Sequence, residues 1–175
     1  ACTHDARYYV DDFKTFVSNP HRDLVFIVDS ALIASFGESY KKIIRLLKEY
    51  LKAAKVYDAS FGGEITLLKL KEHIQRKSEK TVISSQCPTV VKYIELNHPG
   101  LIKFLAPIDS PAMALARYLR EVENFEGEIA YLGPCISKAF EFDTAAEKKY
   151  INYSMTFQRI KQIIVKRNLK LRNLK

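Results

Sequence analysis

The chain has 175 residues, of which 47% are hydrophobic and 27% are charged, a composition typical of a globular protein with a buried core. No apolar run approaches the roughly 18 to 20 residues of a membrane-spanning helix, and no signal-peptide pattern opens the chain, so we expect no membrane span. The net charge of +8 is spread over predicted helices, apart from a basic cluster at 166–175. Because no motif for bases or phosphates accompanies this charge, we expect no nucleic-acid partner.

The hydrophobic pattern alternates between strand-like and helix-like segments. The run 24–29 is continuous, apolar and rich in β-branched residues, as in a strand covered on both faces. The segment 39–56 instead places apolar residues on one helical stripe, formed by Tyr40, Ile43, Ile44, Leu47, Leu51 and Ala54. In chain order we expect strands at 7–13, 24–29, 55–60, 80–85 and 127–133, and helices at 39–56, 63–77, 89–97, 111–122 and 157–168.

This alternation predicts an α/β fold in which mostly parallel sheets are flanked by helices. Two helix starts are marked in the sequence. Ser110 reads as an N-cap followed by Pro111 at the first helical position, and Thr156 reads as a cap of the last helix. The chain shows no internal repeat and no clear linker, and the loop at 141–152 is our candidate boundary between two lobes.

The three cysteines, Cys2, Cys87 and Cys135, are odd in number and show no paired local spacing. This pattern argues against a disulfide scaffold and favours a reducing compartment, so we predict a cytoplasmic protein.

Cys87 and Cys135 occupy equivalent positions, because each follows a predicted core strand and stands next to a proline. In an open parallel sheet, ligands bind beyond the carboxyl ends of the strands. A thiolate near a helix N-terminus is stabilised by unpaired N–H groups, and such soft ligands suit iron–sulfur clusters. The alternative is that both are inert core thiols, since free cysteine is among the most buried residues. Two cysteines do not complete a four-thiolate site by themselves.

Two motifs around these cysteines carry a family resemblance. The stretch SSQCP at 84–88 matches a Thr/Ser-Ser-Cys-Cys-Pro motif, and PCISKAFE at 134–141 matches a Pro-Cys-x-x-Lys-x-x-Glu motif. The order of these motifs, with weaker similarity upstream, resembles the catalytic domain of the iron-only hydrogenases over about residues 24–165. The resemblance implies that family's α/β catalytic domain, present here as an incomplete copy.

The resemblance also implies an active centre, a [4Fe–4S] cluster joined through a cysteine to a two-iron subcluster with CO and cyanide ligands. In this chain Cys87 and Cys135 would ligate the [4Fe–4S] cluster. Lys138 would reach toward a cyanide, and Glu141, one turn on, would be its ion-pair partner. The alternative for Lys138 is a solvent-facing helix lysine.

Three further positions are implied only loosely. Ser110 and Met113 match a stretch that lines the family's pocket, but helix capping and core packing explain both residues equally well. Ser30 lies in a stretch that differs from the family's usual pocket sequence.

The departures from the family pattern bear on activity. Gln86 stands where catalytic members carry the cysteine that passes protons, and an amide is a poor proton carrier near neutral pH. The family's two acidic relay positions fall on Leu70 and His73, and the neighbouring Glu72 would replace them only if the alignment shifts by one residue. A degraded proton path favours a sensory, slow or non-catalytic relative.

The resemblance further predicts that the chain is a piece of a longer protein. The third motif of the family, which carries the other two cluster cysteines, does not occur in these 175 residues, so we expect no cluster to be bound by this chain alone. Residues 1–22 resemble the tail of a ferredoxin-like module with Cys2 as its last cluster ligand, and residues 23–175 are the partial hydrogenase-like domain.

Three functions stay open, and with them the question of whether the parent protein is an enzyme. The first is a redox protein that acts on or senses H₂, with an electron-transfer partner or with fused signalling or ferredoxin-like domains. The second is an iron–sulfur cluster assembly factor that shares the domain. The third is a metal-free α/β interaction module in which Cys87 and Cys135 are core thiols.

Overall fold

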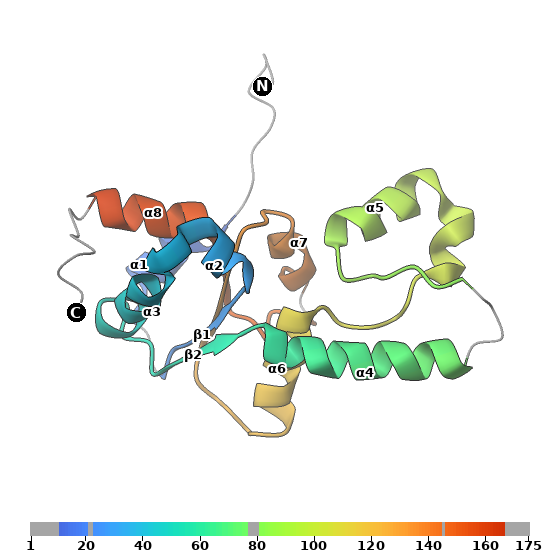
Figure 1. Ribbon diagram of the computed structural model, residues 1–175, viewed down its shortest axis with the longest axis horizontal. Coiled ribbons are helices and arrows are strands. Elements are labelled where there is room, and N and C mark those ends of the chain that lie inside the picture. Colours follow the sequence, from blue (N-terminus) through green and yellow to red (C-terminus); the bar gives the residue numbers. More distant parts are fainter. Residues whose placement is uncertain (1–10, 21–22, 77–80, 145, 167–175) are drawn as a thin grey trace, which may run out of the picture.

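A parallel four-stranded sheet forms the centre of the molecule (Figure 1). The computed structural model describes residues 11–20, 23–76, 81–144 and 146–166. The strands are β1 (Val25–Val28), β2 (Lys55–Asp58), β3 (Ile129–Gly133) and β4 (Tyr153–Thr156). They lie in the order β2-β1-β3-β4, and every neighbouring pair is parallel. The predicted α/β fold with a parallel sheet is therefore confirmed.

Helices connect the strands, as parallel pairing requires. The helices are α1 (Phe13–Ser18), α2 (Ala31–Phe36), α3 (Tyr40–Glu49), α4 (Ser60–Arg76), α5 (Pro88–Asn97), α6 (Pro111–Glu121), α7 (Lys138–Phe142) and α8 (Phe157–Lys166). Two 3-10 segments, η1 (Gly37–Ser39) and η2 (Pro99–Phe104), complete the described elements. The helix predicted at 39–56 ends at Glu49, and Lys52 in the following turn has a positive φ of 58°.

The sheet carries a hydrophobic core on each face. All four residues of β1 are buried, and their side chains alternate between the two faces. Phe26 and Val28 contribute to a core with α1, α3 and α8, whereas Val25 and Ile27 contribute to a core with α6. Residues 24–28 are continuously apolar because helices cover both faces of this strand, and Asp29 follows at its carboxyl end. On α3, the predicted stripe packs into the first core through Tyr40, Ile43, Ile44, Leu47 and Leu51.

Helix α4 packs against α6 at very close range. A Cβ atom at Gly62 would lie 1.9 Å from the Pro111 carbonyl oxygen and 2.9 Å from the Cβ atom of Leu115, so a side chain does not fit there. One turn on, the buried Thr66 hydroxyl lies 3.0 Å from the Gly62 carbonyl oxygen and 3.1 Å from that of Asp109. Beyond this crossing α4 extends past the sheet, toward the side of the molecule on which α5 lies (Figure 1).

The chain between α4 and α6 departs from the prediction. Residues 81–85, predicted as a core strand, do not join the sheet, and Ile83 forms only an isolated parallel bridge with Leu105. An apolar, β-branched run indicates extended backbone but does not identify its partner, which is why the prediction was wrong. We call residues 81–105, which include α5 and η2, the arm, and they lie apart from the strands beyond α7 (Figure 1).

Other expectations at the helix and strand ends had mixed outcomes. Ser110 caps α6 as predicted, because its hydroxyl oxygen accepts from the Met113 N–H. Strand β4 forms where no strand was predicted. The buried Thr156 hydroxyl, predicted to cap α8, has no hydrogen-bond partner among the described residues. Of the strand predicted at 7–13, residues 7–10 lie outside the described residues, and Phe13 begins α1.

Arg117 of α6 holds two loops against this helix. Its Nε atom lies 2.8 Å from an Asp109 carboxylate oxygen, and its Nη2 atom lies 3.0 Å from a Glu147 carboxylate oxygen. The guanidinium also lies over the Tyr150 ring, 4.2 Å from its centroid. The segment 141–152 is therefore packed onto α6, while the division of the chain into domains stays a prediction. None of the described helices is long and apolar enough to cross a bilayer.

Candidate metal centre

Cys135 lies directly beyond the carboxyl end of a buried strand, as the sequence predicts. All residues of β3 are buried, whereas Pro134 and Cys135, in the turn toward α7, are exposed. The Cys135 sulfur lies 2.9 Å from the Ser137 hydroxyl oxygen. In a parallel sheet this edge is where ligands bind.

Cys87 lies at the N-cap position of α5 and is also exposed. Its side chain makes no capping hydrogen bond, and Pro88 occupies the first turn of the helix. The unpaired N–H groups of a helix start favour a negatively charged group. Unlike Cys135, however, Cys87 follows no strand of the sheet, so the predicted equivalence of the two positions is wrong in this respect.

Lys138 links the two cysteine-bearing segments. Its ammonium group donates a 3.0 Å hydrogen bond to the Gln86 carbonyl oxygen, next to Cys87 in the chain. The same group lies 2.5 Å from a Glu141 carboxylate oxygen, which confirms the predicted ion pair. The Lys138 and Glu141 side chains are only 14% and 19% exposed, so Lys138 is not a solvent-facing helix lysine.

The exposure of both thiols contradicts one part of the third interpretation, namely that Cys87 and Cys135 are core thiols. Cys87 and Cys135 are not core residues, and neither belongs to a hydrophobic cluster of the described chain. Cys2, predicted to ligate another cluster, lies outside the described residues.

The donor set fits half of a four-thiolate site. Within the described ranges, no group of three or more His, Cys, Asp or Glu side chains is arranged to hold a metal ion. Two soft sulfur donors are suitable ligands for an iron–sulfur cluster, but a cubane with four thiolates needs two more.

Two aspartates stand at the same edge of the sheet and cap helices. Asp29 follows β1 and accepts from the Ala31 N–H at 2.9 Å, while Asp58 ends β2 and accepts from the Ser60 N–H at 2.8 Å. Ser30 joins them, because its hydroxyl donates a 2.7 Å hydrogen bond to Asp58. Burial alone would raise the pKa of the Asp58 carboxyl, but the hydrogen bonds from Ser60 and Ser30 outweigh it and lower the pKa below its usual value.

Other predicted pocket residues have structural partners. Ser110 is 2% exposed and caps α6, and Met113 is 1% exposed within the core between α6 and the sheet. These are the alternatives that the sequence leaves open for both residues. Their place in a cofactor pocket, like that of Ser30, stays a prediction.

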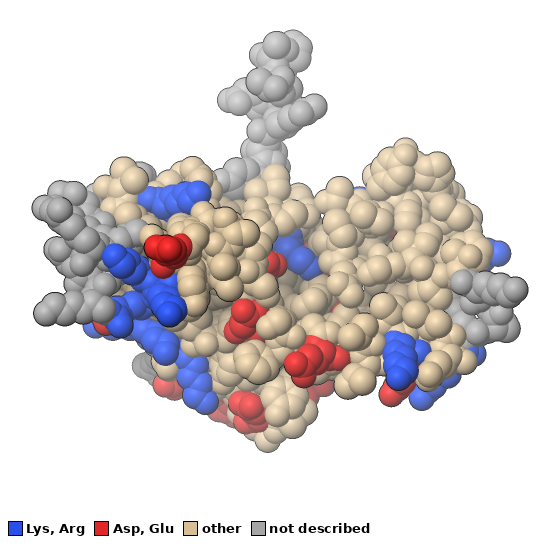
Figure 2. Space-filling view, viewed as in Figure 1, with Lys and Arg blue, Asp and Glu red and all other residues tan. Residues whose placement is uncertain are grey.

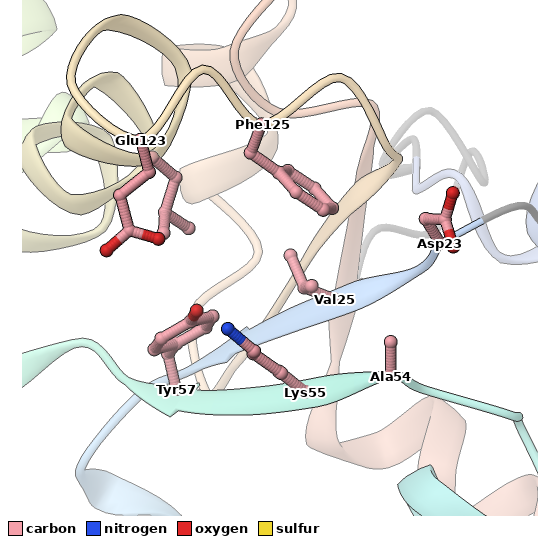
Figure 3. A pocket seen from close by; sticks show the side chains of 8 residues that line it. Asp23, Val25, Ala54, Lys55, Tyr57, Glu123 and Phe125 are labelled. Carbon is pink, nitrogen blue, oxygen red and sulfur yellow. The ribbon is translucent and has the colours of Figure 1, made fainter.

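Two apolar pockets lie beside the edge strand β2, and Figure 3 shows the first of them. Asp23 and Val25, at the start of β1, line the first pocket, which has a volume of about 150 Å³. The second, of about 320 Å³, shares Tyr57, Leu119 and Glu123 with the first. Neither pocket includes a cysteine or Lys138, so the pockets and the candidate metal centre are separate features.

The chain matches the family model described as "Iron only hydrogenase large subunit, C-terminal domain" over residues 22–175. The chain belongs to this family. The resemblance carried by the motifs at 84–88 and 134–141 is thereby confirmed, and the family connects the chain with iron–sulfur proteins.

The relatives of this chain carry the names of two different kinds of protein, a hydrogenase and a cluster assembly factor. Iron hydrogenase 1 of Clostridium pasteurianum is 24% identical over 161 residues, which are 81% of this chain and 28% of that protein. The cytosolic Fe-S cluster assembly factor NAR1 of Yarrowia lipolytica is 29% identical over 97 residues, which are 53% of this chain and 20% of that protein. Apo [FeFe]-hydrogenase HydA1 from Chlamydomonas reinhardtii has the same fold, with a TM-score of 0.73 at 20% identity, over 94% of this chain and 49% of that chain.

This chain thus spans about half the length of the solved hydrogenase structures it matches, and between 20% and 28% of the curated relatives above. The comparisons establish a hydrogenase-like domain. They do not separate a hydrogenase from an assembly factor, because proteins of both names are among the relatives.

The residues that depart from the hydrogenase pattern lie beside Lys138 and on α4. Gln86 is half-buried beside Lys138, and its backbone oxygen accepts from that lysine. Leu70 and His73 are half-buried on α4, and the His73 Nε2 atom is buried with no hydrogen-bond partner among the described residues. Glu72 is 63% exposed and pairs with Arg76 in solvent, so it is not directed into a buried relay.

Sequence patterns alone do not mark Tyr131, which reads as an ordinary core residue of a strand. In the structure its hydroxyl donates a 3.0 Å hydrogen bond to an Asp29 carboxylate oxygen at the edge that carries Cys135. The sequence signal that points to it is Gly133, which lies two residues later in a buried strand where glycine is otherwise unfavourable.

Proposed function

We propose that Cys87 and Cys135 supply two of the four thiolate ligands of a [4Fe–4S] cluster in a hydrogenase-like protein. The observation that carries this proposal is the hydrogen bond from Lys138 to the Gln86 carbonyl oxygen. It places the segment after β3 next to the segment before α5, and each of these segments carries one exposed thiol. The other two donors come from polypeptide outside these 175 residues.

Lys138 has the chemistry to hold an anionic ligand at this site. Its ammonium group is a compact donor, and the Glu141 carboxylate and the Gln86 carbonyl fix its position. In a hydrogenase-like parent, Lys138 would face a cyanide of the two-iron subcluster, which would supply the H₂ chemistry when bound. Gln86, in place of a proton-carrying thiol, favours a parent that senses H₂ or turns it over slowly.

A second candidate is an iron–sulfur cluster assembly factor. The absence of an ionisable side chain at Gln86 favours it, and the similarity to an assembly factor, 29% identical over 97 residues, supports it. The same two thiolates would hold a [4Fe–4S] cluster, without the two-iron subcluster.

Either function has consequences for the cellular compartment and the partners of the protein. We infer a cytoplasmic protein, because thiolate ligands of this kind persist in a reducing compartment. A hydrogenase-like parent also needs an electron-transfer partner, or fused ferredoxin-like or signalling domains, to deliver or report electrons.

Infrared spectroscopy of the full-length protein, matured anaerobically, tests the choice between the two functions. CO and cyanide bands are expected if the parent carries the two-iron subcluster. An intact [4Fe–4S] absorbance without those bands supports the assembly factor. Full-length protein that binds no iron at all would overturn both, and the third interpretation, a metal-free interaction module, would remain.

A further inference from the structure

We propose that Tyr131 is a positioning residue for Cys135, and that its hydrogen bond to Asp29 holds the turn after β3 in its ligating conformation before any cluster is bound. The relevance of this positioning to a cluster rests on the proposed function. The positioning itself is a property of the chain alone and is testable without metal.

The Tyr131 side chain lies between the sheet and the segment that follows Cys135. It is 1% exposed, and its ring packs edge-on against that of Phe142, the last residue of α7, with the ring centroids 5.2 Å apart. Its hydroxyl donates to Asp29 across 102 positions of the chain. The two ends of this side chain therefore connect α7 with the turn after β1.

Gly133 makes room for this arrangement. A Cβ atom at Gly133 would lie 2.2 Å from the Tyr131 hydroxyl oxygen and 2.5 Å from the ring carbon that bears it. The phenol thus lies against the backbone just two residues before Cys135. The close approach explains why a residue without a side chain stands there, although glycine weakens the interior of a strand.

Asp29 is held in place by hydrogen bonds at both of its carboxylate oxygens and at its backbone N–H. One carboxylate oxygen accepts from the Ala31 N–H at 2.9 Å, and the other accepts from Tyr131. The Asp29 N–H donates a 2.9 Å hydrogen bond to the Leu132 carbonyl oxygen. The end of β3 is therefore attached to the turn after β1 by both a backbone and a side-chain bond.

The phenol remains a donor under all ordinary conditions. Burial raises the pKa of Tyr131 far above its usual value, and the charge of Asp29 raises it further. Glu141 and Cys135 add smaller contributions of the same sign. The Tyr131 hydroxyl therefore stays protonated and donates its hydrogen bond to Asp29.

Packing alone does not account for a tyrosine at this position. Phenylalanine would fill the same core and would keep the contact with Phe142, but it would leave one oxygen of Asp29 without its donor. Tyr131→Phe therefore isolates the hydrogen bond. Tyr153→Phe is the matched control, because the Tyr153 hydroxyl donates a 2.9 Å hydrogen bond to Glu128 from the neighbouring strand β4.

The test is hydrogen exchange measured by mass spectrometry on this chain without metal. Tyr131→Phe is expected to speed exchange in residues 133–142 by about tenfold and to leave residues 153–160 unchanged, because one net hydrogen bond to a charged group is lost locally. Tyr153→Phe is expected to leave 133–142 unchanged. Gly133→Ala, which displaces the phenol, should reproduce the effect of Tyr131→Phe. Asp29→Asn, which keeps an acceptor oxygen, should give a smaller increase than either.

A second measurement reports on the thiols themselves. Cadmium(II) added to this chain binds exposed thiolates, and its sulfur-to-metal absorbance gives an affinity. We expect about fivefold weaker binding in Tyr131→Phe and no change in Tyr153→Phe. Equal exchange at 133–142 and equal cadmium affinity in wild type and Tyr131→Phe would overturn the positioning role.

The outcomes also separate this inference from the proposed function. If Tyr131→Phe loosens 133–142 but Cys135→Ala leaves the cluster of the full-length protein intact, the proposed ligand is wrong and the positioning stands. If Cys135→Ala removes the cluster while Tyr131→Phe changes neither exchange nor cadmium affinity, the ligand stands and the positioning role is wrong.

Discussion

The sheet and the arm carry one candidate ligand each, but they are built differently. Strand β1 is buried over its whole length and is paired on both sides, by β2 and by β3. The arm has one isolated bridge to hold its ends together, and several of its apolar side chains are exposed, among them Tyr93 at 56% and Leu96 at 70%. Figure 2 shows that the face over α5 and η2 is almost free of charged side chains.

The difference teaches that the two thiols are not held equally. Cys135 follows β3 and is fixed by the sheet, by Tyr131 and by α7. Cys87 is fixed mainly through polar contacts of its neighbours, since the Ser85 hydroxyl lies within hydrogen-bonding range of two carbonyl oxygens and the Gln86 carbonyl accepts from Lys138. Mutations in the sheet region should therefore unfold the chain, whereas mutations in these polar contacts should loosen the arm.

The largest effect is expected where α4 crosses α6. Gly62→Ala places a methyl group 1.9 Å from the Pro111 carbonyl oxygen, so the two helices must separate and the free energy of unfolding should fall by about 3 kcal/mol. Gly63→Ala is the matched control, because the nearest atom would be 4.0 Å away, and alanine favours a helix over glycine by about 0.5–1 kcal/mol. Urea unfolding measures both. Equal midpoints for the two variants would contradict the close crossing.

The link between the sheet and the arm should be next in size. Lys138→Met leaves the largely buried Glu141 carboxylate without its cation and the Gln86 carbonyl without its donor, so we expect a loss of about 2 kcal/mol. Lys92→Met is the control, because the Lys92–Glu95 pair is 67% and 44% exposed and should contribute less than about 0.5 kcal/mol. Urea unfolding of the two variants checks this difference. A Lys138 variant no less stable than the Lys92 variant would remove the proposed link.

A smaller and local effect is expected within the arm. The Ser85 hydroxyl lies within hydrogen-bonding range of the Ala106 carbonyl oxygen and 3.1 Å from that of Ile108. Ser85→Ala should cost about 1 kcal/mol and should speed hydrogen exchange at Ile83 and Ala106 without affecting the sheet. Ser84→Ala serves as the control, since Ser84 is exposed and accepts only a long 3.5 Å bond from Gln86 N–H. Faster exchange throughout the sheet in Ser85→Ala would show that the arm is not a separate unit of stability.

The smallest expected effect is a change in how the free energy of unfolding depends on pH under acidic conditions. Because the pKa of Asp58 is lowered in the folded chain, its contribution is complete above its usual pKa of 3.8 and is lost as the pH falls through the lower folded value. Asp58→Asn keeps an acceptor for the cap but does not titrate. The stability advantage of wild type over this variant should therefore stay constant above about pH 5 and shrink as the pH falls below the usual pKa of 3.8. A difference that stays constant with pH would show that Asp58 does not contribute through its charge.

The same contrast between sheet and arm explains what the sequence predicts. The strand at 24–29, the helical stripe on 39–56 and the cap at Ser110 are local patterns. The strand and the cap are confirmed, whereas the stripe packs as predicted in a helix that already ends at Glu49. The run 80–85 has a strand's composition but lies next to the arm's own Leu105 instead of the sheet. The local pattern predicts an extended backbone there, but the choice of the pairing strand depends on tertiary structure.

The site shows a similar division. The motifs mark Cys87, Cys135 and the ion pair of Lys138, because residue types and spacings are visible in the chain. The hydrogen bond from Tyr131 to Asp29 joins residues 102 positions apart, and no local sequence pattern predicts this pairing. Long-range polar contacts of this kind are found only when the fold is known.

Iron and acid-labile sulfide in the full-length protein, with Cys87→Ala and Cys135→Ala measured separately, test the central claim that both thiols ligate one cluster. Each variant is expected to lose about four iron and four sulfide per chain relative to wild type, with its far-ultraviolet circular dichroism unchanged. Full iron and sulfide content in either variant would contradict a shared cluster at these two cysteines.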